Sequence, residues 1–303
     1  MALKSPDEVA AGMAQLGFRK AALPAGKTLL LGFLAGAYVA LGGLLAVRAA
    51  GALPKEAWGG LARLVFGGVF PVGLMIVIVA GAELVTGNFM TQSLAYLDGK
   101  VGLFEGVVRN WVLVYLGNFA GSVFVAFVLA YLSGIVMEPV RTGDLVTQMP
   151  WAAFAVRTAN PKTALSWWQA FLRAAGCNWL VGLAVWMAFS AEDIAGRILV
   201  IWWPIMAFAV IGFEHSVANM FLIPLGLFAG SDPAYLAFVG TSAGAAGHVP
   251  VLQATWGTFI VNNLIPVTLG NMAGAGVFVG AAYWYVYLRR AERGEAAKVS
   301  RAV

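Results

Sequence analysis

The sequence predicts an all-α polytopic membrane protein with six transmembrane helices. Of its 303 residues, 61% are apolar and only 11% are charged. A soluble domain has about 45–50% apolar and about 25% charged residues, so this chain is too apolar to be one. Its apolar segments are also far longer than the ~10-residue strands of a membrane β-barrel. These observations leave a helical membrane protein as the expected fold class.

Residues 1–27 are expected to form a cytoplasmic amphipathic segment. Ser5 and Glu8 have the spacing of a capping box, which marks the start of a helix. Val9 and Met13 follow at helical spacing and share one apolar face. We expect this face to lie along the membrane surface.

The next part of the chain, 28–288, is expected to be a six-span transmembrane domain, followed by a basic cytoplasmic tail at 289–303. If both termini are cytoplasmic, the inside segments hold 12 of the 19 Lys and Arg residues, as the positive-inside rule requires. We therefore expect a multi-pass protein of the cell (inner) membrane. Its apolar spans are predicted at 28–50, 61–96, 107–137, 165–190, 197–230 and 254–288.

The second and fifth spans are too long to be simple helices. Span 61–96 has 36 residues, which would extend ~54 Å as a helix across a hydrocarbon core of ~30 Å. Each long span also contains one carboxylate, Glu83 or Glu214, where an unpaired charge is costly. Both spans are therefore predicted to be broken. The two carboxylates are expected to accept hydrogen bonds from backbone N–H groups freed at the breaks.

Two motifs occur twice in the same order. Residues 81–88 and 212–219 share the pattern G-x-E-x-x-x-small-N, and 110–121 and 263–274 share Asn followed by L-G-N-x-A-G. Spans 1–3 and 4–6 are therefore predicted to be two copies of one unit. Because three is odd, the second copy enters the membrane inverted, which is the 3+3 repeat of many transporters. The Gly-x-x-x-Gly pairs in the second motif are expected to permit close helix approach.

The residues that break this symmetry are the candidate site. His215 aligns with Leu84 and Thr86 aligns with Val217, so each broken span contributes one distinct polar side chain. We expect both to project into one central cavity. Lys162 precedes the fourth span, where two roles are open: it either snorkels to the interface or concentrates anions at a vestibule.

Composition excludes several other classes. The single cysteine, Cys177, allows no internal disulfide and no cysteine-based metal site, and two histidines are too few for a haem pair. We expect no metal and no cofactor. The net charge of +5 is explained by membrane orientation and implies no nucleic-acid partner.

Four stretches, 82–88, 177–181, 212–220 and 263–271, closely resemble the formate/nitrite transporter family. The resemblance covers nearly all of the six-span domain. It implies an aquaporin-like six-helix protomer and a homopentamer with one pore in each protomer. It also implies passage of small monovalent anions of weak acids, together with protons.

The resemblance also implies roles for individual residues. His215 matches the central pore histidine, Thr86 its partner on the loop that interrupts the second span, and Lys162 the basic residue of the vestibule. The remaining matches are an outer constriction at Phe70 and Phe208, apolar narrowings at Leu74, Leu84 and Ala218, and supporting polar residues at Asn178 and Glu214, with Glu83 as the repeat mate of Glu214.

Different segments of the chain resemble branches of the family with different substrates. Residues 177–181 and Trp202-Trp203 look more like the nitrite branch, 263–268 look more like the formate branch, and hydrosulfide relatives share the same plan. Formate is the favoured substrate. With one buried histidine and no ring of arginines, the acid is expected to cross the constrictions largely in its neutral form.

The hypothesis that the chain is an enzyme rests on one weak sequence pattern. Residues 240–244 satisfy G-x-S-x-G around Ser242, with His248 close by, as in a serine hydrolase. The pattern lies in a small-residue connection without the strand-to-helix turn that presents such a nucleophile. We therefore interpret it as a loop and expect the chain not to be an enzyme.

Overall fold

The computed structural model describes residues 3–53, 55–241, 244–245 and 248–289. Six helices in this part of the chain are long and apolar enough to cross a membrane, which confirms the expected fold class. They are Ala25–Ala50, Ala57–Ala80, Leu103–Leu132, Trp167–Ser190, Ile194–Ile211 and Trp256–Leu288. Residues 290–303 of the predicted tail lie outside the described residues.

The named elements in the first half of the chain are all helices. They are α1 (Pro6–Ala21), α2 (Ala25–Ala50), α3 (Lys55–Val69), α4 (Val72–Ala80), α5 (Val85–Leu97), η1 (Leu103–Val108), α6 (Arg109–Phe124) and η2 (Val125–Leu132). The η elements are π-helical stretches that continue the neighbouring helix.

The second half begins with two short strands and is otherwise helical. Its described elements are β1 (Val140–Thr142), β2 (Leu145–Gln148), α7 (Pro150–Thr163), α8 (Trp167–Ser190), α9 (Ile194–Ile211), α10 (Ser216–Gly230), α11 (Pro233–Val239), α13 (Trp256–Thr258), η3 (Phe259–Leu264), α14 (Ile265–Ala275), η4 (Gly276–Ala281) and η5 (Trp284–Leu288). Helices α10 and α11 meet at an angle of 70° and together form a further candidate span.

The β1–β2 hairpin departs from the all-α expectation. The strands are antiparallel, and Thr142 pairs with Leu145 across a two-residue turn. Gly143 in this turn has a φ of +60°, a conformation that glycine adopts without strain. The hairpin is too short to leave a clear alternating pattern in the sequence, which is why it was not predicted.

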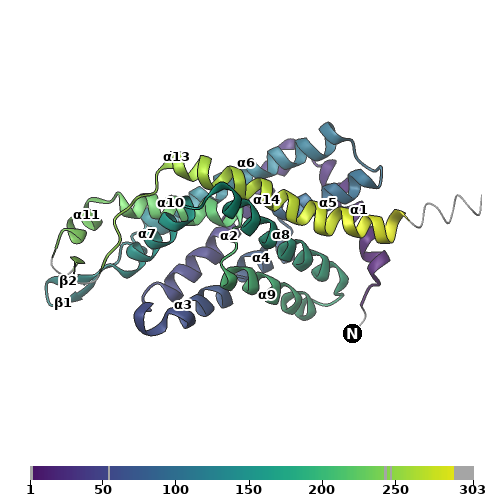
Figure 1. Ribbon diagram of the computed structural model, residues 1–303. Helices are drawn as coiled ribbons and strands as arrows, with labels where there is room; N and C mark the ends of the chain where they lie inside the picture. Colours follow the sequence, from purple (N-terminus) through teal and green to yellow (C-terminus); the bar gives the residue numbers. More distant parts are fainter. Residues whose placement is uncertain (1–2, 54, 242–243, 246–247, 290–303) are drawn as a thin grey trace, which may run out of the picture.

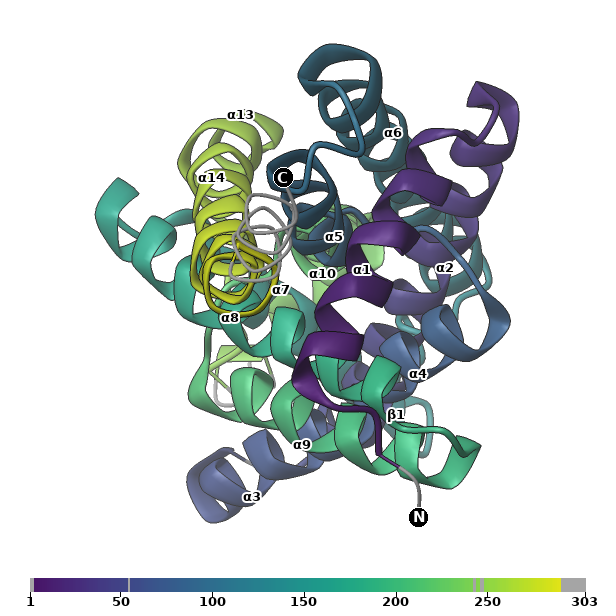
Figure 2. The same cartoon turned by 90° about the vertical axis from the view of Figure 1, so that its right-hand side faces the viewer.

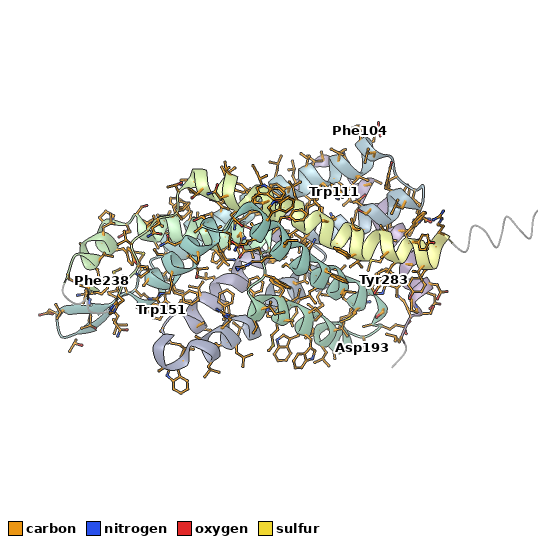
Figure 3. All side chains as sticks on the ribbon, in the orientation of Figure 1. Phe104, Trp111, Trp151, Asp193, Phe238 and Tyr283 are labelled. Atoms are coloured by element: carbon orange, nitrogen blue, oxygen red, sulfur yellow. The ribbon has the colours of Figure 1, made fainter. Side chains whose placement is uncertain are left out.

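The hairpin and α11 lie at one end of the molecule, and α1 lies at the opposite end (Figure 1). Trp151 and Phe238 are found toward the hairpin end, whereas Asp193 and Tyr283 are found toward the α1 end (Figure 3).

Helix α1 begins at the predicted capping box. The backbone N–H of Ser5 donates to Glu8 Oε2 at 2.8 Å, and this bond holds the pKa of Glu8 below its usual value. The expected contact of α1 with the membrane surface is wrong. Val9 and Met13 are each only 1% exposed and belong to the protein core. Helix α1 lies across the end of the bundle (Figure 2), because α5 packs against its apolar face.

Two helix pairs, α2 with α6 and α8 with α14, are in backbone contact. A Cβ atom added to Gly121 would lie 1.9 Å from the carbonyl oxygen of Phe33. One added to Gly274 would lie 2.3 Å from the carbonyl oxygen of Ala175. No side chain other than hydrogen fits there, so the predicted close approach at the Gly-x-x-x-Gly pairs is confirmed.

Candidate functional site

The helices on either side of Glu83 and Glu214 are separate elements. Helix α4 is followed by Gly81 with a φ of +82°, and α9 is followed by Gly212 with a φ of +87°. In this left-handed region only glycine is unstrained, so each helix ends at its glycine. The next helices begin at Val85 and Ser216.

Asn118 satisfies the backbone at the first of these turns. Its Oδ1 accepts a hydrogen bond from the N–H of Val85 at 2.9 Å. Its Nδ2 donates to the carbonyl oxygen of Glu83 at 2.9 Å. The side chain of a neighbouring helix, α6, thus supplies both partners that the interrupted helix lacks.

Asn271 does the same at the second turn. Its Oδ1 accepts from the N–H of Ser216 at 2.8 Å, and its Nδ2 donates to the carbonyl oxygen of Glu214 at 3.0 Å. The expectation that the carboxylates of Glu83 and Glu214 serve this purpose is wrong. The asparagine amide offers both a donor and an acceptor, which a carboxylate does not.

Both carboxylates are used in buried ion pairs instead. Glu214 Oε1 lies 2.9 Å from Nζ of Lys162, and the two side chains are 4% and 17% exposed. Glu214 Oε2 accepts from Nδ2 of Asn219 at 2.7 Å and from Nδ2 of Asn263 at 3.3 Å. These three donors compensate for the cost of burying the charge.

Glu83 has a similar set of partners, with one asparagine donor in place of two. It lies 3.1 Å from Nζ of Lys20, with the two side chains 7% and 16% exposed. Asn88 Nδ2 donates to Glu83 at 2.7 Å and to Asn110 Oδ1 at 2.9 Å. Lys20 also donates to Asn88 Oδ1 at 2.8 Å, which closes the cluster.

Sequence analysis missed Lys20, although a signal was present. Lys20 stands five residues before the first residue of α2, Ala25. Lys162 stands five residues before the first residue of α8, Trp167. Because α2 and α8 contain the first span of each proposed repeat, the two lysines occupy matching positions, and either one points to the other.

His215 and Thr86 are in direct contact. His215 Nε2 lies 3.0 Å from Thr86 Oγ1, and both side chains are buried. The backbone N–H of Ala218 donates to His215 Nδ1 at 3.1 Å, so this nitrogen acts as an acceptor. In the neutral ring the proton is therefore on Nε2, which donates to the hydroxyl of Thr86.

Among the described residues, neither Asn178 nor Glu214 makes a hydrogen bond to the imidazole. Asn178 Nδ2 donates to the carbonyl oxygens of Thr86 at 3.0 Å and Asn271 at 2.7 Å. Asn178 therefore supports the partner of the histidine. The reason is that both ring nitrogens of His215 already have hydrogen-bond partners.

Two cavities meet at His215. The larger one, which we call the vestibule, has a volume of about 560 Å³, and the smaller one a volume of about 10 Å³, roughly the space of one water molecule. Among the described residues, only Phe70, Phe208 and His215 line both cavities. The two phenylalanine rings lie 5.9 Å apart, edge to face. This pair forms the boundary between the two cavities.

The other predicted narrowings divide between the two cavities. Leu74 and Leu84 line the small cavity, whereas Ala218 lines the vestibule. Thr86 lines neither cavity, so the expectation that it projects into a central cavity together with His215 is wrong. Its hydroxyl lies against His215 Nε2 instead.

The vestibule has a strongly positive lining. It contains Lys162 and Glu214, and three arginines that sequence analysis did not single out: Arg63, Arg157 and Arg173. These arginines come from α3, α7 and α8, and they are dispersed along the chain. No local motif marks them, so the sequence, which predicts no ring of arginines, does not indicate that these three line one cavity.

The described residues provide no support for the hydrolase hypothesis. Ser242 lies outside the described residues, and His248 is a turn residue with a φ of +47°. Across the described ranges, His, Cys, Asp and Glu side chains form no group of three that would hold a metal ion.

Comparisons with known proteins give one consistent result. The family model for formate/nitrite transporters matches residues 7–285. A probable formate transporter of Methanothermobacter thermautotrophicus is 45% identical over 291 residues, covering 94% of this chain and 98% of that protein. The formate channel BtFdhC of Bacillus thuringiensis is 39% identical over 290 residues, covering 96% and 98%. A solved pentameric formate channel with formate bound aligns with a TM-score of 0.70 and 32% identity, covering 87% of this chain and 98% of that one.

Proposed function

Because this chain belongs to the formate/nitrite transporter family, we propose that it conducts small monovalent weak-acid anions across a membrane, with formate as its main substrate. The observation that carries the proposal is the contact between His215 and Thr86 beside the Phe70–Phe208 boundary. A polar pair at this depth, next to an apolar constriction, is what a selective pathway requires.

The constriction favours a neutral permeant. A carboxylate that enters a space bounded by Phe70, Phe208, Leu74 and Leu84 loses its hydration, which costs several kcal/mol or more. Loss of water also raises the proton affinity of the anion. Formate therefore takes up a proton in the vestibule and crosses the boundary as formic acid.

His215 provides a hydrogen-bond donor at this boundary. The N–H of Ala218 occupies Nδ1, so the neutral ring carries its proton on Nε2. At rest this proton is donated to Thr86 Oγ1. A carbonyl oxygen of the acid can replace the hydroxyl as acceptor, and the threonine hydroxyl then becomes free to bind the acid.

The ion pair between Lys162 and Glu214, which line the vestibule, is compatible with this mechanism. Lys162 and Glu214 together carry no net charge, so the pair does not trap an anion permanently beside His215. Lys162 retains N–H donors for a passing substrate, since an ammonium group has three and Glu214 accepts one.

The assembly and orientation are part of the same proposal. A pentamer with one pathway in each protomer is supported by the likeness to a pentameric channel. The matched bonding of Asn118 and Asn271 supports the inverted repeat. The excess of Lys and Arg in the predicted inside segments supports cytoplasmic termini in the inner membrane, with the vestibule open to the outside.

Anion flux into liposomes that contain the purified chain tests the function. Formate, nitrite, hydrosulfide, acetate and chloride are compared over a pH series, with protein-free liposomes as the control. Formate flux should exceed chloride flux and should rise as the external pH falls. Equal flux in empty and loaded liposomes contradicts transport, and faster nitrite or hydrosulfide flux reassigns the substrate within the family.

A further inference from the structure

The vestibule holds more positive charge than its ion pair accounts for. In the part of the chain that the structure describes, four cations line it, and Glu214, already paired with Lys162, is the only carboxylate among the lining residues. Arg157 is half-buried, and Arg63 and Arg173 are exposed. Within the described residues, none of these three arginine side chains has an ion pair or a hydrogen bond to a protein group.

The three arginines lie on three different helices and line the same cavity. Arg63 comes from α3 and Arg173 from α8, while Arg157 lies on α7, about one and a half turns before Lys162. The backbone carbonyl of Arg173 accepts the N–H of Glu214 at 3.4 Å, so this arginine adjoins the ion pair. A cleft lined by one sign of charge concentrates counter-ions and increases their rate of entry.

The guanidinium group also selects by shape. Its planar fork of N–H donors matches an anion with two coplanar oxygens and binds it through two parallel hydrogen bonds. Formate and nitrite present such a pair of oxygens. Hydrosulfide and chloride offer one atom and gain only the attraction of the charge.

We propose that Arg63, Arg157 and Arg173 form a capture site for two-oxygen monovalent anions in the vestibule, before the step at His215. This inference rests on the proposed transport function and adds where and by what chemistry the anion is first held. The arginines act on the charged form, and protonation follows deeper in the vestibule.

Uptake and efflux of labelled formate test the proposal in bacterial cells that express the chain and lack a formate channel of their own. The variants R63Q, R157Q and R173Q, singly and combined, are compared at equal membrane abundance. We expect each single change to raise the half-saturating formate concentration by about threefold, and the triple change by about tenfold or more, at low ionic strength. The rise in half-saturating concentration should appear only for transport that begins at the vestibule, and the maximal rate should not change. The rise should become smaller as salt is added.

Two further variants separate the components of the effect. R141Q, in β1, removes a charge from the same end of the molecule but not from the vestibule lining, and should leave the half-saturating concentration unchanged. R157K keeps the charge and loses the fork, so it should weaken capture of formate and nitrite more than that of hydrosulfide.

The outcomes test the proposed transport function and the capture site separately. If the unmodified chain carries no formate, the proposed function is wrong. If it does, and the triple variant has the same half-saturating formate concentration as the unmodified chain for both uptake and efflux, the capture site alone is wrong. An equal effect of R141Q, or equal effects of R157K on all anions, also contradicts a site that recognises two oxygens.

Discussion

Asn88 and Asn219 occupy matching positions beside Glu83 and Glu214, but only the amide oxygen of Asn88 has a partner. Lys20 donates to Asn88 Oδ1 at 2.8 Å. Among the described residues, nothing donates to Asn219 Oδ1, although it is buried. Each ion-pair cluster therefore has one hydrogen bond that the other lacks, because Asn263 Nδ2 donates to Glu214 Oε2 but Asn110 makes no such bond to Glu83.

This difference predicts unequal effects of removing the two lysines. K20M and K162M each leave a buried carboxylate unpaired, which costs about 3–5 kcal/mol. K20M should cost about 1 kcal/mol more, because it also leaves Asn88 Oδ1 without a donor. Thermal unfolding in detergent measures the order. Equal melting temperatures for the two variants would show that the extra bond has no effect on stability.

Restoring charge balance should recover part of the loss. The double variants K20M/E83Q and K162M/E214Q remove both charges of a pair. Each should be more stable than its lysine single variant, since no unpaired charge remains buried. A double variant no more stable than the single one would show that the lysine contributes through packing alone.

His215→Asn separates the chemistry of the histidine from its structural role. Asparagine is a favoured N-cap and can accept the Ala218 N–H that His215 Nδ1 accepts now, so α10 should still form. The variant cannot titrate. We expect it to change the pH dependence of formate flux, measured in liposomes, while its melting temperature stays close to that of the unmodified chain. An unchanged pH profile would remove the imidazole from the transport step.

Thr86→Val tests the resident acceptor of the histidine. Valine has a similar shape but leaves Nε2–H of His215 buried without a partner, at a cost of about 1–3 kcal/mol. Formate flux should fall because the site loses one of its two polar groups. T86S keeps the hydroxyl and serves as the matched control. Similar flux in T86V and T86S would contradict a role for the hydroxyl.

Asn271→Leu tests the support of the second turn. The change removes a donor and an acceptor that serve backbone groups of Ser216 and Glu214. The free energy of unfolding should fall by about 2–4 kcal/mol, because two buried backbone groups lose their partners. N262L, at an exposed position in η3 where the side chain makes one long hydrogen bond of 3.4 Å to the carbonyl oxygen of Thr163, is the control and should cost less. Equal melting temperatures for N271L and N262L would contradict this role of Asn271.

The helical membrane fold could be predicted from the sequence because its signals are local. Long apolar segments show the spans, and the repeated G-x-E pattern marks Glu83 and Glu214 as related positions. The pairing of His215 with Thr86 came from the family resemblance, and the structure adds that Ala218 fixes which ring nitrogen carries the proton.

The residues that sequence analysis missed depend on contacts between distant segments. Arg63, Arg157 and Arg173 converge from three helices, and nothing in their neighbouring residues indicates a shared cavity. The partners of Glu83 and Glu214 were assigned wrongly for a related reason. Local reasoning favoured the nearest free backbone groups, whereas Asn118 and Asn271 reach those groups from other helices.

The backbone contacts at Gly121 and Gly274 have a mechanical consequence. Helices that touch through side chains can slide past each other as those side chains exchange rotamers. Helices α2 and α6, and likewise α8 and α14, have no such layer at these points, so sliding would first require the helices to separate. The two pairs therefore act as stiff walls of fixed spacing. The turns at 81–84 and 212–215 and the helices α4 and α9 that precede them lie outside these pairs, so they can move without separating them.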